Sequence, residues 1–128
     1  MPRKKSATLT DHELRLMNVL WRDGDGTVAD VVAGLEPPPL AYSTVLTTLR
    51  TLEQKGYIAH EEEGRAYVYR PLIQRSEAAR SAVDLVLGRF FGNSPGQLAV
   101  TLLGDAPLSE DELATISRMI AQRKKGGK

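Results

Sequence analysis

The sequence predicts a mainly helical protein that carries one small β-hairpin, and three observations lead to this fold class. Apolar residues recur at helical spacing in six segments of the 128-residue chain. Capping residues begin these segments, and glycines or prolines end most of them. One stretch between the third and fourth segments instead has strand-forming residues on both sides of a glycine-containing turn.

The first helix is expected in the stretch LTDHELRLMNVLW. Thr10 and Glu13 match a capping box, in which each side chain accepts a hydrogen bond from the other residue's backbone N–H. Leu9 and Leu14 occupy the positions of a hydrophobic staple. The apolar stripe expected to face the core consists of Leu14, Met17, Leu20 and Trp21. The DGDG sequence that follows ends the helix.

The second and third helices are separated by a proline stop. Thr27 caps the short second helix, VADVVAGL. The three prolines at 37–39 prevent that helix from continuing. The third helix is predicted over residues 42–55, and Gly56 follows it as a left-handed C-cap.

A two-stranded hairpin is predicted next, in YIAHEEEGRAYVYRP. Tyr57, Ile58 and the run at 66–69 are strand-forming residues. We place the turn at 63–64 and the end of the hairpin at Pro71.

Three further helices are predicted after the hairpin, in SEAARSAVDLVLGRFF, NSPGQLAVTLLG and LSEDELATISRMIAQ. Ser94 caps the second of these and is followed by Pro95 at the first helical position, where proline is favoured. Ser109 and Glu112 repeat the capping box of the first helix.

The order of the elements predicts two domains and a tail. Three helices followed by a hairpin is the plan of a winged helix-turn-helix domain, which we expect in residues 1–73 as a DNA-binding domain. Residues 74–124 are expected to form a helical dimerisation domain, and residues 125–128 a flexible basic tail. The C-terminal helices are too few and too apolar to bury their own surface, which favours a homodimer. The predicted dimerisation residues are Val83, Val86, Leu87, Phe90, Phe91, Leu98, Leu102, Ile116 and Ile120.

Composition excludes several classes of protein. The chain has no cysteine, which rules out disulfides, thiolate metal sites and thiol catalysis and favours a cytoplasmic protein. No apolar run reaches the ~18 residues that a membrane-spanning helix needs, so no membrane association is expected. The net charge is +1, and residues 1–73 carry nine Lys/Arg against ten Asp/Glu, which gives −1. Any case for nucleic acid must therefore rest on local arrangement.

The third helix has four threonines on its outer surface, although threonine is a mediocre helix former. The side expected to face the core holds Val45, Leu49 and Leu52, with help from Tyr42 and Leu46. The outer side carries short hydroxyls and two cations, and its one acid is Glu53. Such a slim helix suits the major groove, where threonine can hydrogen-bond base edges and touch the thymine methyl. The alternative interpretation is that the threonines fill space beside another helix.

The predicted DNA-binding residues lie on this face and in the hairpin. They are Ser43, Thr44, Thr47, Thr48, Arg50, Thr51, Lys55 and Arg65. The hairpin allows two interpretations, because phosphate would repel the acidic run at 61–63, whereas Arg65 and Arg70 can reach the backbone. It either contacts DNA as a wing or only covers the core.

Two other classes of function are alternatives. A winged-helix protein-interaction module that does not bind DNA is favoured by the acidic hairpin and by the charge of residues 1–73. An enzyme is disfavoured, because His12 and His60 stand in no catalytic motif and the EEEG run is typical of a solvated turn rather than a metal site. We therefore predict no enzymatic activity, no metal and no cofactor.

Four segments together resemble the penicillinase-repressor family (BlaI, MecI and the copper-responsive CopY relatives). They are LTDHELRLMNVLW, YSTVLTTLRTLEQKGYI, EGRAYVYRP and LSEDEL, within residues 9–122. The resemblance implies a homodimeric repressor of resistance or stress-response genes that binds a dyad operator in double-stranded DNA. It implies DNA contact by Thr44 and Thr47, where similar repressors also have threonine. The family often has a basic residue where Thr51 stands, whereas here the neighbouring Arg50 is basic.

Induction in this family follows two routes, and the chain departs from both. The penicillinase repressors are cut by an inducing protease in a segment resembling QLAVTLLG, but Thr101-Leu102 stands here in place of the usual Asn-Phe bond. The copper-responsive members use a C-terminal cysteine cluster, which this chain lacks. An inducing protease therefore stays among the expected partners, and copper sensing by cysteines is excluded.

Overall fold

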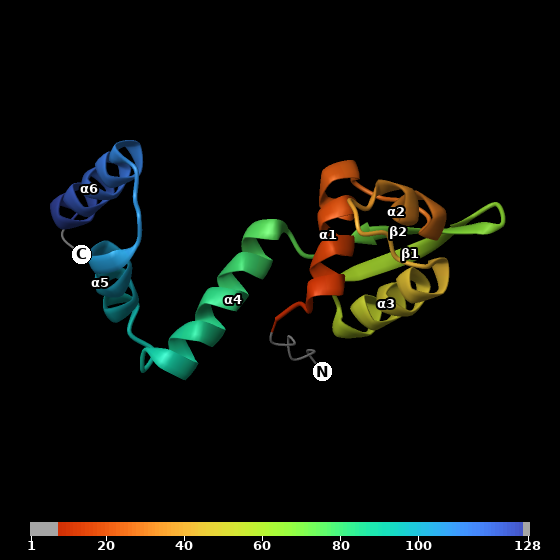
Figure 1. Ribbon diagram of the computed structural model, residues 1–128, viewed down its shortest axis with the longest axis horizontal. Coiled ribbons are helices and arrows are strands. Elements are labelled where there is room, and N and C mark those ends of the chain that lie inside the picture. Colours follow the sequence, from red (N-terminus) through yellow and green to blue (C-terminus); the bar gives the residue numbers. More distant parts are fainter. Residues whose placement is uncertain (1–7, 127–128) are drawn as a thin grey trace. The chain divides into compact units, whose positions relative to one another are not determined.

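The computed structural model describes residues 8–126. The chain divides into two compact units, Met1–Val86 and Leu87–Lys128. The elements along the chain, labelled in Figure 1, are α1 (Asp11–Asp23), α2 (Val28–Gly34), α3 (Tyr42–Lys55), β1 (Ile58–Glu63), β2 (Ala66–Pro71), α4 (Arg75–Phe90), α5 (Pro95–Asp105) and α6 (Glu110–Lys125). The predicted fold class, mainly helical with one hairpin, is confirmed.

The caps predicted from the sequence begin and end the helices. The N–H of Glu13 donates to Thr10 Oγ1 at 3.2 Å, and the N–H of Thr10 donates to Glu13 Oε1 at 2.9 Å. Ser109 and Glu112 form the same box at 2.9 and 3.0 Å. Gly56 ends α3 with φ of 91°, a left-handed conformation that a side chain would strain.

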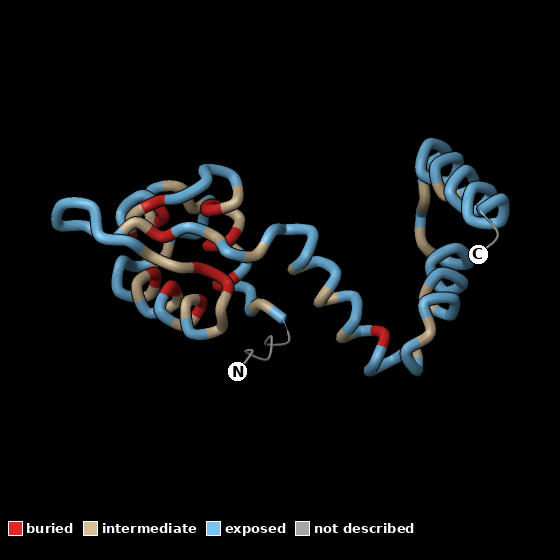
Figure 2. The backbone as a smooth tube through the Cα atoms, turned by 180° about the vertical axis from the view of Figure 1, so that it is seen from behind, coloured by how far each residue is buried: buried red, intermediate tan, exposed pale blue. Residues whose placement is uncertain are grey.

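The first three helices and the hairpin enclose one core. β1 and β2 pair antiparallel, from Ile58 opposite Pro71 to Glu63 opposite Ala66. Tyr69 also exchanges backbone hydrogen bonds of 2.8 and 2.9 Å with Gly26, which fasten the α1–α2 connection to β2. Figure 2 marks in red the buried positions of this core, which are Leu16, Met17, Val19, Leu20, Val28, Val31, Val45, Leu49, Leu52, Tyr57, Ile58 and Tyr69.

α1 turns only part of the predicted stripe to the core, and Met17 and Leu20 are buried as predicted. Leu14 is 41% exposed and Trp21 is only partly buried, whereas Leu16 and Val19 are buried. The physical reason is that Glu13 itself is buried at the start of α1. Residues three and four positions further along a helix share its face, so they point to the core together with Glu13.

The structure also differs from the prediction at Tyr42 and at the hairpin turn. Tyr42 is 56% exposed rather than directed at the core, because it stands at the first position of α3, beyond the end of the buried stripe. The turn residues are Gly64 and Arg65, one position later than predicted, because Glu63 still pairs with Ala66. Gly64 has φ of 63°, which suits glycine.

α4 belongs to both units. Ala78, in its first turn, packs against the core of the first unit. The division into residues 1–73 and 74–124 stays a prediction about function. Of the predicted tail, Lys125 ends α6, and residues 127–128 lie outside the described residues.

The second unit buries little of its apolar surface. Among its described residues only Leu87 is buried. Phe90 is 75% exposed. Other large apolar side chains exposed on α5 and α6 are Val100, Leu102, Leu103, Leu113, Met119 and Ile120. An apolar surface of this kind is typical of an interaction site.

Candidate nucleic-acid interface

α3 presents a polar outer face because its apolar residues point inward. Val45, Leu49 and Leu52 are buried as predicted, so the positions between them face outward. The outward residues are Ser43, Thr47 and Arg50, which are exposed, and Thr44, Thr48 and Thr51, which are partly buried. The predicted row of hydroxyls is therefore a continuous surface of one helix.

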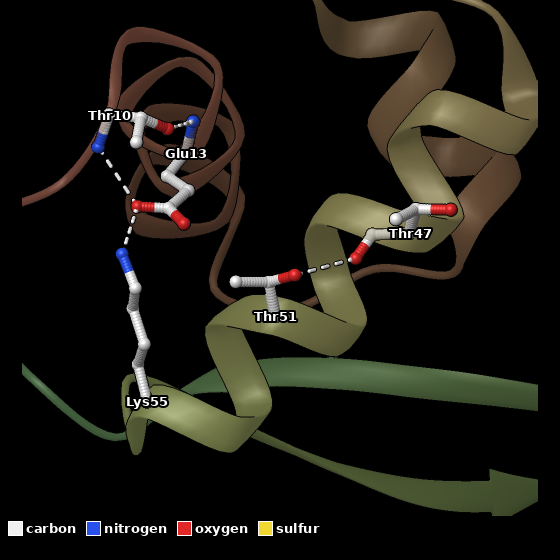
Figure 3. A network of polar contacts seen from close by, with 5 residues as sticks. All are labelled: Thr10, Glu13, Thr47, Thr51 and Lys55. Carbon is white, nitrogen blue, oxygen red and sulfur yellow. Dashed lines mark hydrogen bonds and ion pairs between the residues drawn. The ribbon is translucent and has the colours of Figure 1, made fainter.

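The four threonine hydroxyls are not equivalent. Thr48 Oγ1 donates to the carbonyl of Thr44 at 2.8 Å, and Thr51 Oγ1 donates to the carbonyl of Thr47 at 3.2 Å (Figure 3 draws the second bond). Such i−4 bonds satisfy the hydroxyl within its own helix. The hydroxyls of Thr44 and Thr47 have no such bond to another described residue. These two hydroxyls are free to donate to a ligand.

The N-terminus of α3 is left without a side-chain cap. Ala41 is its N-cap residue and makes no side-chain hydrogen bond to the first turn. The first N–H groups of a helix have no partner inside the helix, and they lie at the positive end of its dipole. The N–H groups at this end of α3 can therefore donate hydrogen bonds to a phosphate oxygen.

Lys55 has a partner inside the protein. Its Nζ lies 2.7 Å from Oε1 of Glu13, and the two side chains are 23% and 6% exposed (Figure 3). Glu13 also holds the backbone N–H of Thr10, so one carboxylate joins the start of α1 to the last turn of α3. The ion pair gives Lys55 a structural role that the sequence did not reveal, and its predicted contact with DNA stays a prediction.

A histidine joins the hairpin to α3. The Nδ1–H of His60 on β1 donates to both carboxylate oxygens of Glu53, at 2.8 and 2.9 Å. The His60 ring stacks on Tyr67, with centroids 4.3 Å apart, and lies 5.4 Å from the ring of Tyr69. The base of the hairpin is thereby fixed against the helix that carries the threonines.

The far end of the hairpin is acidic and open. Glu61, Glu62 and Glu63 are exposed, and Glu61 pairs with Arg70 at 3.2 Å. Arg65 stands in the turn and is exposed, with no ion pair to a residue in the described part of the chain. Of the two hairpin arginines, Arg65 is therefore the one whose charge is unbalanced.

A groove of about 410 Å³ lies between α3, the hairpin and the start of α2. Arg50 and Arg65 both line it, so two predicted DNA-binding residues from separate elements share one cavity. Tyr42 and Tyr67 line it as well, and no pattern in the sequence indicated either as a site residue. Their exposure depends on where α3 begins and on the hairpin register, which periodicity alone does not fix.

Two tyrosines of the first unit have altered acidity. Burial raises the pKa of Tyr57, with nearby Lys55 opposing the shift and Glu13 reinforcing it. Burial also raises the pKa of Tyr69, where Glu53 reinforces the shift and Arg50 opposes it. Both hydroxyls therefore stay protonated at neutral pH and can donate a hydrogen bond.

The predicted dimerisation residues lie on α4, α5 and α6. Leu87 is buried within its own chain. Those that are partly buried are Phe91, Leu98 and Ile116. Those that are exposed are Val83, Val86, Phe90, Leu102 and Ile120. Their role in dimerisation stays a prediction.

Residues 8–126 contain neither a candidate metal cluster nor a helix that could cross a membrane. They contain no group of three or more His, Cys, Asp or Glu side chains that could hold a metal ion. No helix in this range is long and apolar enough to cross a membrane. His12 is exposed on α1, and His60 is engaged by Glu53.

Comparison with known proteins agrees with the fold. The sequence profile described as penicillinase repressor matches residues 9–122. The chain belongs to the penicillinase-repressor family. Members of this family are DNA-binding transcriptional repressors and not enzymes, so the predicted repressor function and the predicted lack of enzymatic activity are confirmed.

Two relatives illustrate how similar this chain is to other members. The penicillinase repressor of Bacillus licheniformis is 27% identical over 122 residues, which cover 94% of this chain and 95% of that protein. An uncharacterised 16.5 kDa protein of Latilactobacillus sakei is 24% identical over 116 residues, 90% of this chain and 80% of that protein. The family match therefore extends over both units.

Solved structures resemble the chain as well. The DNA-binding domain of the repressor BlaI is 32% identical, with a TM-score of 0.51, over 58% of this chain and 93% of that domain. YusO of Bacillus subtilis is 20% identical, with a TM-score of 0.50, over 91% of this chain and 75% of that protein, which supports the fold alone. The winged-helix fold predicted from the sequence is confirmed.

Proposed function

We propose that the chain is a homodimer that reads a dyad operator with α3 and represses resistance or stress-response genes in the cytoplasm. The observation that carries the proposal is the outer face of α3. Thr44 and Thr47 offer hydroxyls without a hydrogen-bond partner among residues 8–126, and the exposed Arg50 lies beside them. In a family of repressors, such a face is best explained as the reader of base edges in the major groove.

The apolar surface of the C-terminal helices supports the homodimer. Phe90 is 75% exposed on α4, and α5 and α6 contain no buried residue among those described. Water contact with this much apolar surface is unfavourable, and pairing with a second copy would remove it.

A symmetric dimer determines the geometry of its operator. Each α3 would enter one major groove, and the two half-sites would be separated by an integral number of turns, at about 34–36 Å per turn. The first unit alone has few cations on its DNA-facing side, so a single half-site would bind weakly. Linking two such units raises the affinity through effective concentration.

The experiment is a gel shift followed by footprinting on the DNA upstream of the gene itself, since many local repressors bind there. We expect one shifted complex and two protected half-sites related by a dyad. A scrambled duplex of equal length at the same salt concentration is the control. Protection of a single half-site with full affinity would contradict the dyad, and no shift at all would contradict DNA binding.

We also propose an inducing protease as a partner. Thr101 and Leu102 are exposed on α5 in a single copy of the chain, so a protease can reach this segment when the dimer dissociates. A cut between them would separate α6 from α4 in the chain and weaken a dimer built from both. The chain cut at this bond should bind the operator more weakly than the intact chain, and equal affinity would argue against this route of induction.

A protein-interaction module is the second candidate, because the hairpin end is acidic. Glu62 and Glu63 are exposed and form no ion pair with a residue in the range 8–126. Such a surface suits a basic protein partner rather than phosphate. The same gel shift separates the two functions, since a protein-interaction module would shift neither duplex.

A further inference from the structure

The groove between α3, the hairpin and the start of α2 has chemistry that the row of threonines does not explain. The side chains that line it include Tyr42, Leu46, Arg50, Arg65, Tyr67 and Tyr69. All of them belong to the first unit. The groove therefore combines two cations with three phenols and has no carboxylate among its lining residues.

The two arginines carry charge that the protein does not balance. Arg50 and Arg65 are exposed, and neither forms an ion pair or a hydrogen bond with another residue of the described range 8–126. Arg70 on the same hairpin differs, because Glu61 holds it at 3.2 Å. A guanidinium without an internal partner can bind an anionic oxygen with paired N–H donors.

The groove also contains a buried tyrosine whose hydroxyl is unused. Tyr69 is 2% exposed, and its hydroxyl forms no hydrogen bond with any residue that the structure describes. Within the described residues, the buried side-chain polar atom without a partner is Asn18 Oδ1, so the Tyr69 hydroxyl still meets solvent in the groove and can donate to a ligand there. Burial raises the pKa of Tyr69, which keeps the proton on the hydroxyl, and the charge of Arg50 acts on the same group.

The hairpin side of the groove is held in place by α3. Glu53 accepts two hydrogen bonds of 2.8 and 2.9 Å from His60, and the His60 ring stacks on Tyr67 at 4.3 Å. Stacking restricts the Tyr67 ring before any ligand arrives. Less side-chain freedom is then lost on binding.

We propose that this groove binds one backbone phosphate of the operator DNA, with Arg50 and Arg65 as charge partners and the hydroxyls of Tyr67 and Tyr69 as donors. The inference rests on the proposed function and adds two contact residues and a location to it. The occupant follows from position, because the groove adjoins the face of α3 assigned to the major groove. The major groove of DNA is about 12 Å wide and is bordered by phosphates on both sides, so a DNA strand must pass close to α3.

The first test compares two arginine variants from the same hairpin. Arg65→Gln should lower the slope of log affinity against log salt by about one unit, on operator and on scrambled DNA alike. Arg70→Gln is the matched control, since it removes the same charge outside the groove, and it should keep the wild-type slope. Both positions are exposed, so folding should survive in both variants.

The second test locates the phosphate. Single phosphates of one operator half-site are replaced in turn by neutral methylphosphonates. We expect one position at which the replacement weakens wild-type binding about tenfold but barely affects the Arg65→Gln variant, because the two changes remove the same contact. Tyr69→Phe, which deletes only the hydroxyl, should weaken binding at the unmodified operator and show the same loss of sensitivity at that position.

The outcomes separate this inference from the proposed function. If the wild type binds the operator, but Arg65→Gln and Tyr69→Phe respond to every methylphosphonate as the wild type does, the groove is not a phosphate site and the repressor function stands. If Arg65→Gln weakens the binding of inorganic phosphate to the DNA-free protein but leaves the salt slope of operator binding at the wild-type value, the groove binds a free anion instead of DNA. If the wild type binds no duplex, both proposals fail together. Thermal unfolding of Tyr69→Phe confirms that the variant is folded.

Discussion

Thr47 and Thr51 lie one turn apart on α3 and differ in what their hydroxyls do. The Thr51 hydroxyl donates to the carbonyl of Thr47 at 3.2 Å, whereas the Thr47 hydroxyl has no bond of this kind to a described residue. The sequence predicted a row of threonines, and it also selected Thr44 and Thr47 within that row through family resemblance. The hydrogen bonds now supply a physical reason for the same choice.

Thr47→Val should therefore weaken operator binding selectively. Loss of a base contact costs about 1–3 kcal/mol and only on the correct sequence. Valine keeps the volume and has a similar helix preference, so the fold should persist. The measurement is titration against operator and scrambled DNA at two salt concentrations. Thr51→Val is the control and should change operator affinity less. If Thr47→Val binds the operator like the wild type, the threonines on the outer side of α3 serve packing and do not read DNA.

The buried Tyr57 predicts how stability responds to alkali. Burial raises the pKa of Tyr57, so the unfolded chain loses its phenolic proton first as the pH rises above about 10. The folded state then binds more protons than the unfolded state, and stability falls with increasing pH. Urea unfolding between pH 8 and pH 11 should show this decline, and Tyr57→Phe should make it shallower. The exposed Tyr42→Phe is the comparison, and equal slopes for wild type and Tyr57→Phe would contradict the prediction.

At the level of elements, the sequence predicted the helix ends and the inward face of α3, but it missed part of the inward face of α1. Caps are local, so Thr10, Ser94 and Ser109 could be identified from three or four neighbouring residues, and all three accept the predicted N–H. The face that α1 turns inward depends on Glu13, whose ion-pair partner Lys55 is 42 positions away. No local pattern indicates a contact of that separation, and a buried carboxylate is unexpected without its partner.

The contribution of the Lys55–Glu13 ion pair to the packing of α1 against α3 can be measured by substitution. Lys55→Met keeps the aliphatic stem and leaves Glu13 buried without its cation, which should destabilise the first unit by about 1–3 kcal/mol. Urea unfolding measures this loss. Glu13→Gln keeps an oxygen that can accept from Thr10, and combining both changes in a double-mutant cycle isolates the pair.

The same Lys55→Met variant decides whether Lys55 also contacts DNA. A phosphate contact would lower the salt slope of DNA binding by about one unit, whereas a purely structural role would leave the slope unchanged. The sequence predicted contact with DNA, because Lys55 is one of the two cations on the outer side of α3. A stability loss without a change in slope would assign Lys55 to the fold alone.

At the level of the whole molecule, the net charge does not indicate DNA binding, whereas the positions of the charged side chains do. A net charge of −1 over residues 1–73 argues against nucleic acid if charge is only counted. The structure pairs Arg70 and Lys55 with acids and leaves Arg50 and Arg65 unpaired within the described residues, where both line one groove. A small number of unbalanced charges in one place can direct binding where the total charge cannot.

The apolar surface of α4 to α6 predicts that the folded chain pairs with a second copy. Phe90 is 75% exposed, and truncating a phenylalanine that becomes packed in an interface costs about 3–5 kcal/mol. Phe90→Ala should therefore shift the chain toward monomer in sedimentation at micromolar concentration. Arg89→Ala, an exposed neighbour on α4, is the control and should leave the dimer intact.

Loss of the dimer should also lower the affinity for the full dyad operator. Phe90→Ala leaves α3 untouched, so affinity for a single half-site should stay at the wild-type value while affinity for the full dyad falls, because the two half-sites are no longer linked. Raising the protein concentration should restore binding to the dyad. A wild-type chain that sediments as a folded monomer, or a Phe90→Ala variant that binds the dyad as tightly as the wild type, would show that the exposed apolar surface serves another contact.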